Sequence, residues 1–307
     1  MDVPLLPKYW PEEKKRSPWI GSALSLLAYL LLAIFFIRDL KVAAILVFIL
    51  LFHELGHYLA MRHYRYLETG IFFIPLLGAF VSGSKRTISQ QESATIILAG
   101  PLPGILLGIA LLFTTRTLPI DLATMAVLKG TATALILLNG FNLLPIYPLD
   151  GGQLLNRVFL DEESWVSRLF LLLSALLLTW LAFQLKFYAL LLLPLLLLWR
   201  NRKDKTLKKI EERIAAAGID TDIDYEQLSD TNYWKIRNIL IEVHPRFAYL
   251  NSATDAYDSK EAAVHTMIAS LLDRKLILDL TLTKKIMIAT LWIAALLLTL
   301  LFGLLNW

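Results

Sequence analysis

Long apolar runs follow one another along most of this chain. A helix needs roughly 20 apolar residues to cross a bilayer of about 30 Å. Runs of this length lie at about 19–37, 42–62, 94–114, 123–144 and 286–306. A further run, 165–199, is too long for one span and is interrupted by Gln184 and Lys186, so we expect a helical hairpin that crosses twice. The pattern predicts an all-α polytopic membrane protein with about seven transmembrane helices.

Positive charge predicts the orientation of these helices. Basic residues precede the first run, follow the second and follow the hairpin, so all of them face one side if the hairpin crosses twice. The positive-inside rule then places the N-terminus in the cytoplasm. A single crossing of 165–199 would invalidate this assignment. The residues are Lys14, Lys15, Arg16, Arg62, Arg65, Lys85, Arg86, Arg200, Arg202, Lys203, Lys205, Lys208 and Lys209.

Composition agrees with a membrane protein. Hydrophobic residues make up 57% of the 307 residues, charged residues make up 18%, and there is no cysteine. These values exclude a disordered chain and a secreted disulfide scaffold. The net charge of +4 is explained by basic cytoplasmic loops, so we expect a lipid bilayer and no nucleic acid as partner. Any metal ion must be bound by His, Asp or Glu.

The segment from Arg200 to Lys285 has the mixed composition of a small, mostly helical cytosolic domain. It contains His244 and His265, which lack the spacing of metal ligands and are expected to be packed or solvated. Substrate recognition, gating and a plain connecting role all remain open for it. The predicted parts are a cytosolic segment 1–18, a transmembrane core 19–160, a helical hairpin 161–199, a cytosolic domain 200–285 and a C-terminal transmembrane helix 286–307.

His53, Glu54 and His57 form an HExxH pattern inside the second apolar run. Residues four apart lie on one face of a helix, so both imidazoles can reach one zinc ion, and Glu54 can accept a proton from water beside them. Accidental spacing of packed polar residues is the alternative. Uncompensated polar groups in hydrocarbon cost several kcal/mol each, which favours a bound cation.

A catalytic zinc site needs a third protein ligand and an open position for water. Asp150 is the intramembrane carboxylate placed to supply that ligand, because it follows the fourth long run. The second and fourth runs cross in the same direction, so HExxH and Asp150 lie at similar depth. Prolines and glycines around Asp150 are expected to break the helix there, beside a protein cavity. They are Pro145, Pro148, Gly151 and Gly152.

The two motifs together, HELGH at 53–57 and NLLPIYPLDGG at 142–152, resemble the site-2 protease family of intramembrane zinc metalloproteases. The family pattern of HExxH followed by NxxPxxxLDG is matched at each position, and the resemblance covers about Val42 to Gly152. It implies His53, His57 and Asp150 as ligands of one zinc ion per chain, Glu54 as general base and Asn142 as a substrate-positioning or oxyanion-stabilising residue. A helix-end hydrogen bond is an equally open role for Asn142.

Two other segments resemble this family less sharply. Ala99, Gly100 and Pro101 are similar to its AGP element, but Gly104 stands where asparagine often follows, and close helix packing is the expected role. The segment Ile71 to Gly83 resembles a membrane-associated β hairpin or re-entrant loop. An exposed strand there could pair with an extended substrate, or the segment could simply cover the site.

The resemblance implies a metalloendopeptidase of the prokaryotic cell membrane. Its partners would be single-span membrane protein substrates, such as membrane-tethered transcription regulators or anti-sigma factors, cut within or near their transmembrane segments. Three alternatives remain: a membrane zinc protease with Glu as third ligand, a proteolytically inactive adaptor, and an ion-coupled transporter that uses the same buried polar residues. Zinc content and proteolysis separate the adaptor and the transporter from a protease, and the LDGG setting of Asp150 speaks against a Glu ligand.

Overall fold

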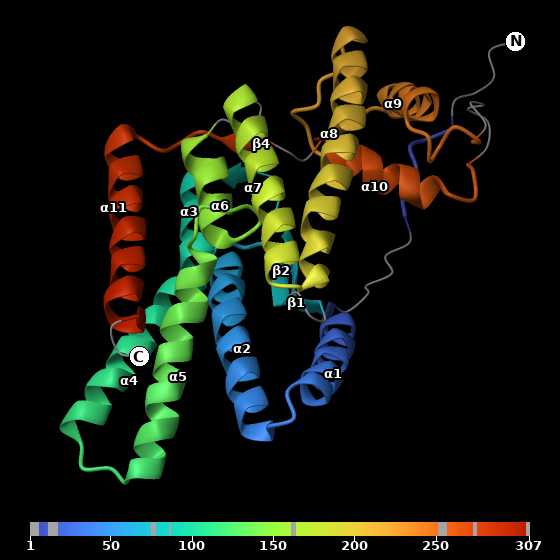
Figure 1. Ribbon diagram of the computed structural model, residues 1–307. Helices are drawn as coiled ribbons and strands as arrows, with labels where there is room; N and C mark the ends of the chain where they lie inside the picture. The colour runs from blue at the N-terminus through green and yellow to red at the C-terminus, as the bar shows by residue number, and fades with distance from the viewer. Residues whose placement is uncertain are drawn as a thin grey trace, which may run out of the picture. The chain divides into compact units, whose positions relative to one another are not determined.

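The computed structural model describes residues 6–11, 18–74, 78–85, 87–160, 164–250, 257–272 and 275–304 (Figure 1). The chain forms two compact units. The membrane unit consists of Ser17–Pro194 and Ile277–Trp307, and the small unit consists of Met1–Arg16 and Leu195–Leu276. The sequence analysis divided the chain into five parts. These two units do not test that division, which stays a prediction. Of the basic residues used for orientation, Lys14, Lys15, Arg16 and Arg86 lie outside the described residues.

Apolar helices make up the membrane unit, as predicted for an all-α polytopic protein. Within the described residues, six helical stretches are long and apolar enough to cross a membrane, and the chain is a multi-pass membrane protein. One of the six is divided at Gly100 into two helices, and the last continues as a π-helix, η4, at Thr299–Leu304. The helices are α1 Pro18–Phe36, α2 Leu40–His63, α3 Gln90–Ala99, α4 Pro101–Thr117, α5 Leu122–Asn142, α7 Trp165–Gln184 and α11 Leu282–Leu298.

A helical hairpin is present where the long run 165–199 predicted one. Helix α7 ends at Gln184, and the chain returns through the 3-10 helix η2, Tyr188–Leu191, and α8, Leu192–Ala216. The apolar part of the returning arm, Tyr188–Leu197, is shorter than a membrane span. The second crossing, and with it the seventh transmembrane helix, therefore stays a prediction.

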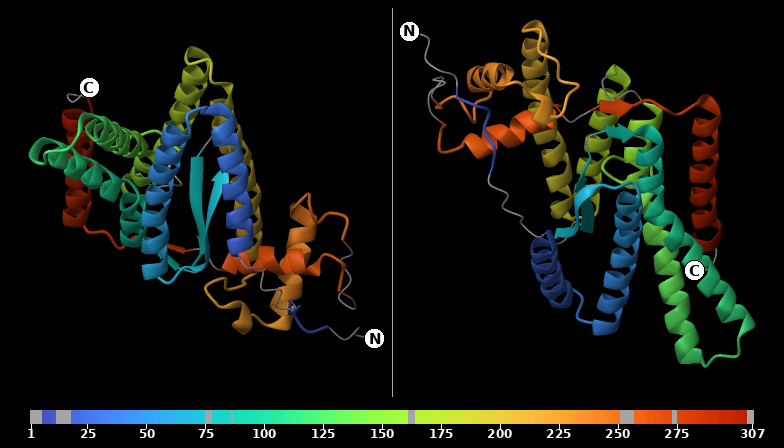
Figure 2. Two further views of the ribbon diagram at one scale, coloured as in Figure 1. Left: turned by 90° about the horizontal axis from the view of Figure 1, so that it is seen from below. Right: turned by 180° about the vertical axis from the view of Figure 1, so that it is seen from behind.

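A β hairpin lies between α1 and α2 (Figure 2). Strand β1, Leu67–Ile74, pairs antiparallel with β2, Gly78–Ser84, and Phe72 lies opposite Phe80. Helix α1 holds the hairpin, because the Phe73 amide donates to Ser25 Oγ at 3.2 Å. The sequence predicted a β hairpin or a re-entrant loop for Ile71 to Gly83, and the hairpin is confirmed. Pro75, within this segment, lies outside the described residues. Two further strands are β3, Thr87–Ser89, and β4, Lys275–Ile277.

The helix break predicted before Asp150 is present. Helix α5 ends at Asn142, and a loop leads to α6, Asp150–Leu154, which continues as the π-helix η1, Leu155–Phe159. Two other helices fasten this loop. Ser174 Oγ of α7 accepts from the Tyr147 amide at 3.2 Å, and Trp292 Nε1 of α11 donates to the Leu143 carbonyl at 2.7 Å. Two backbone groups in the break are thus satisfied by side chains of other helices.

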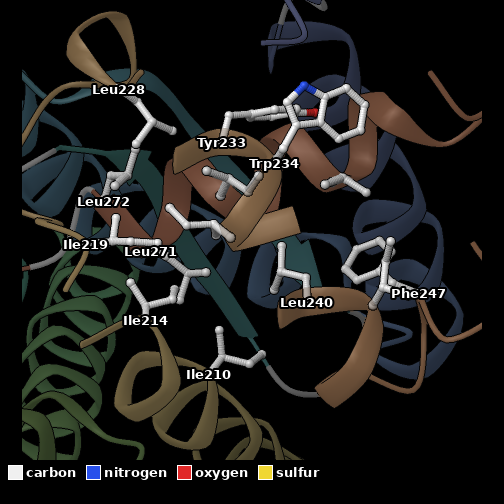
Figure 3. Close-up of a cluster of buried hydrophobic side chains, with 14 of the residues drawn as sticks. Ile210, Ile214, Ile219, Leu228, Tyr233, Trp234, Leu240, Phe247, Leu271 and Leu272 are labelled. Carbon is white, nitrogen blue, oxygen red and sulfur yellow. The ribbon is translucent and has the colours of Figure 1, made fainter. Parts of the chain in front are cut away.

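The small unit is mostly helical, as its composition predicted. The end of α8, the 3-10 helix η3, Tyr225–Gln227, α9, Asp230–Val243, and α10, Glu261–Leu272, enclose one apolar core (Figure 3). Inside it, Arg237 Nε donates to Glu261 Oε1 at 2.8 Å, and the Tyr233 hydroxyl bonds the same carboxylate. His265 packs edge-on against the Tyr225 ring, with centroids 4.4 Å apart, as expected of a packed histidine.

The N-terminal segment belongs to this small unit. Three aromatic side chains donate to its backbone carbonyls: Trp234 to Leu6, Tyr257 to Pro7 and Tyr225 to Tyr9. Lys8 is buried, and its ammonium donates to the carbonyls of Tyr225, Glu226 and Leu228 at 2.8, 2.6 and 2.7 Å. An extended segment without periodicity is therefore held mainly through its backbone and one charged side chain.

We expect Lys8→Met to loosen this segment. The substitution removes three charge-assisted hydrogen bonds, each contributing about 1.5–3 kcal/mol. Hydrogen exchange measured by mass spectrometry on the full chain in detergent should show the Lys8 amide, which donates to Asp230 Oδ1 at 2.9 Å, exchanging at least about tenfold faster. Lys235→Met, an exposed lysine on α9, is the control. Equal exchange in both variants would contradict the role given to Lys8.

Candidate metal centre

The HExxH residues lie in the C-terminal half of α2, a helix capped at its start by Asp39. Glu54 and both histidines are buried, with exposed fractions of 4–8%. Helical spacing brings the imidazoles of His53 and His57 together, and their Nε2 atoms are 3.1 Å apart.

Asp150 meets these histidines from a different part of the chain. It is the first residue of α6, and its Oδ2 lies 3.1 Å from His53 Nε2 and 3.4 Å from His57 Nε2. The three residues form a buried group whose ligand atoms lie within 4.8 Å of one another. The structure thus brings together the three ligands that the sequence motifs suggested, from two separate elements.

The far nitrogen of each imidazole faces an oxygen acceptor. His57 Nδ1 lies 2.7 Å from the Ile96 carbonyl, and His53 Nδ1 lies 2.8 Å from Asn139 Oδ1. If each Nδ1 donates there, each neutral ring turns an Nε2 lone pair toward Asp150 Oδ2, which makes no hydrogen bond with the described residues. Three electron-pair donors then converge in a buried place. Such an arrangement fits a bound cation, and two histidines with one carboxylate fit a divalent metal ion such as zinc.

Glycines let the neighbouring helices come close enough to supply these contacts. A Cβ on Gly100 would lie 2.3 Å from His57 Nε2, and one on Gly56 would lie 2.0 Å from the Ala99 carbonyl oxygen. Any side chain at either position would push α2 away from α3 and α4. This is the close helix packing expected at Ala99, Gly100 and Pro101.

Glu54 and Asn142 occupy different surroundings. The Glu54 carboxylate is buried and close enough to interact electrostatically with both histidines and with Asp150. Asn142 is half-buried at the end of α5 and makes no side-chain hydrogen bond within the described residues, so the helix-end bond considered for it is not seen there. Its role in positioning substrate stays a prediction.

Asn139 is the residue at the site to which the sequence analysis gave no role. It is one helical turn before Asn142, is 1% exposed, and hydrogen-bonds His53 directly. Its polar side chain within a transmembrane run was the available signal. The HExxH and NxxPxxxLDG motifs do not indicate which of the other helices lies against the His53 ring.

A model of peptidase family M50 matches residues 41–136 of this chain. Residues 41–136 are therefore similar to peptidase family M50. The matched range includes the HExxH residues and ends before Asp150, and it confirms the resemblance indicated by the motifs.

Two relatives and one solved structure are similar to parts of this chain. Zinc metalloprotease MJ0392 of Methanocaldococcus jannaschii is 30% identical over 124 residues, which cover 39% of this chain and 36% of that protein. Stage IV sporulation protein FB of Bacillus subtilis is 30% identical over 141 residues, 46% of this chain and 45% of that protein. The chain thus spans less than half the length of either relative. The site-2 protease structure from M. jannaschii is 22% identical with a TM-score of 0.41, covering 58% of this chain and 84% of that one.

Removing the negative charge of Asp150 from the buried group that it forms with His53 and His57 should prevent metal binding. Asp150→Asn keeps the shape of the side chain but removes its anionic ligand atom, so zinc in the purified protein should fall from about one ion per chain to a small fraction of that. Elemental analysis of detergent-purified protein measures this directly. His63→Ala changes an exposed histidine at the end of α2 and should keep the metal. Equal zinc in wild type and Asp150→Asn would exclude Asp150 as a ligand.

Proposed function

We propose that this chain is an intramembrane zinc metalloprotease that hydrolyses peptide bonds within or near transmembrane segments of membrane-anchored substrates. The observation that carries the proposal is the convergence of His53, His57 and Asp150, with Glu54 beside them, on helices of a membrane unit. The M50 match supports the same reaction class.

His53, His57 and Asp150 would hold one zinc ion per chain. When bound, zinc activates a water molecule for attack and polarises the carbonyl of the scissile peptide. Three protein ligands leave a position open for that chemistry, as catalytic zinc sites require. The burial of the group keeps the reacting atoms away from lipid and bulk water.

Glu54 would act as the general base. It follows His53 directly and so lies about 100° further round α2, close to the ligand atoms but on a different side of the helix. In this position its carboxylate can accept a proton from the attacking water and deliver it to the nitrogen of the leaving amine. Both transfers use the same side chain, so the peptide bond is cleaved without a second titratable group.

The substrate must present an unwound backbone. A helix hides its carbonyls in internal hydrogen bonds, so residues that weaken a helix near the scissile bond should favour cleavage. Asn142, at the end of α5, would position that stretch. We propose single-span membrane proteins as substrates, including membrane-tethered transcription regulators or anti-sigma factors, in a prokaryotic cell membrane. The N-terminus would face the cytoplasm, and products would leave on that side.

We expect Glu54→Gln to abolish cleavage while zinc stays bound. The amide cannot take up the proton, so cleavage of single-span substrates in liposomes should slow by about 10²–10⁴-fold. Zinc should remain near one ion per chain, because the three ligands are unchanged. Glu242→Gln, an exposed carboxylate of the small unit, is the control for loss of a negative charge.

The same assay separates the alternatives. Zinc in both proteins without cleavage of any substrate by wild type would favour an adaptor. Absence of zinc from wild type would reject the metalloprotease and favour an ion-coupled transporter. Equal cleavage by wild type and Glu54→Gln would leave the metal site in place but remove Glu54 from the mechanism.

A further inference from the structure

We infer that Asn139 is a positioning residue of the metal site, which fixes the tautomer and the ring orientation of His53. Gly104 on the facing helix provides the space that this side chain needs. The inference rests on the proposed function only for the identity of the ion. It concerns how tightly the site binds a metal, which can be measured whether or not the protein cleaves a substrate.

The orientation of the Asn139 amide follows from its second hydrogen bond. Its Nδ2 lies 2.8 Å from the Leu135 carbonyl, which can only accept, so the nitrogen end of the amide faces Leu135. The oxygen end therefore faces His53 Nδ1, at 2.8 Å. An amide oxygen cannot donate, so His53 Nδ1 must carry the proton. In the neutral ring, the form that binds a metal, the Nε2 lone pair of His53 is then directed toward Asp150.

The two histidines are oriented in different ways. His57 Nδ1 faces the Ile96 carbonyl of α3, so the backbone itself sets its tautomer. His53 depends on a relay, from the Leu135 carbonyl through the Asn139 side chain to the ring. One side-chain substitution can therefore break the relay to His53. The contact of His57 is with a backbone carbonyl, which a side-chain substitution does not remove.

The Asn139 amide sits in a slot on the surface of α4. A Cβ on Gly104 would lie 2.2 Å from Asn139 Nδ2 and 2.7 Å from its Oδ1. One helical turn further along, Gly108 faces α5 in the same way, but its Cβ would meet Ile136 Cγ1 at 2.6 Å. Both glycines bring α4 and α5 together, but Gly104 meets the Asn139 amide itself, whereas Gly108 meets Leu135 only at its Cβ, 3.2 Å away.

Zinc affinity of the full-length protein in detergent tests the relay, measured by competition with a chelator. Asn139→Leu keeps the approximate volume but offers no acceptor, and we expect zinc to bind roughly 10–100-fold more weakly, the usual effect of removing a partner that orients a ligand. Asn139→Asp retains an oxygen acceptor and should recover most of the affinity. Thr115→Val removes a buried hydroxyl of α4 that, among the described residues, bonds only the Leu112 carbonyl of its own helix, and it should bind zinc like wild type.

A second pair of variants tests the geometry without removing any polar group. Gly104→Ala should displace the amide and weaken zinc binding by roughly tenfold. Gly108→Ala disturbs the same helix pair without touching the amide and should weaken zinc binding much less. The visible spectrum of the cobalt-substituted protein should change in Asn139→Leu and Gly104→Ala, because a reoriented His53 alters the ligand field. A purely structural role for Asn139 would leave that spectrum as in wild type.

The outcomes separate this inference from the proposed function. Weaker zinc binding by Asn139→Leu and Gly104→Ala supports the relay even if wild type cleaves no substrate. Equal affinity and an equal cobalt spectrum in wild type and Asn139→Leu overturn the relay even if wild type is an active protease. Equal losses in Gly104→Ala and Gly108→Ala also overturn it, because general loosening of the helix pair would then explain the effect.

Discussion

The convergence of three electron-pair donors inside an apolar helix bundle is the constraint on which the rest of the membrane unit depends. Two imidazole nitrogens and one carboxylate oxygen lie within about hydrogen-bonding distance of one another. With both rings neutral and no cation among them this arrangement is repulsive, and burial in a medium of low dielectric strengthens the repulsion. The backbone and side-chain acceptors behind each ring therefore matter as much as the ligands, because they keep the lone pairs directed inward.

The carboxylate is held by parts of the chain that are far apart. Gly151 lies so close to Leu143 that a Cβ would be 1.9 Å from the Leu143 carbonyl oxygen, and that oxygen accepts a hydrogen bond from Trp292. The position of Asp150 therefore depends on α11, about 140 residues later in the sequence. Because α11 follows the small unit in the chain, that unit is joined directly to a helix that braces a ligand loop. The C-terminal helix is thus a component of the site's support.

The sequence alone predicts features that are set by local periodicity. Apolar runs give the spans within a few residues, the i, i+4 spacing places His53 with His57, and the prolines and glycines mark the break before Asp150. Contacts between distant segments leave no such pattern. The packing of Leu6 to Tyr9 depends on donors more than 200 residues away, and the partner of Asn139 is 86 positions away. The polar Asn139 side chain in an apolar run indicates that it has a partner, but the local sequence does not indicate the partner in either contact.

The departure from the family pattern at Gly104 has a physical explanation in the α4–α5 contact. The pattern often places asparagine at this position, and here the residue is glycine. The amide instead comes from Asn139 on the facing helix, and it fills the space that the missing side chain leaves. The space between α4 and α5 at this level holds one side-chain amide, and either helix could carry it. Asparagine at position 104 would therefore require a small residue at position 139, and the two positions should be considered as a pair.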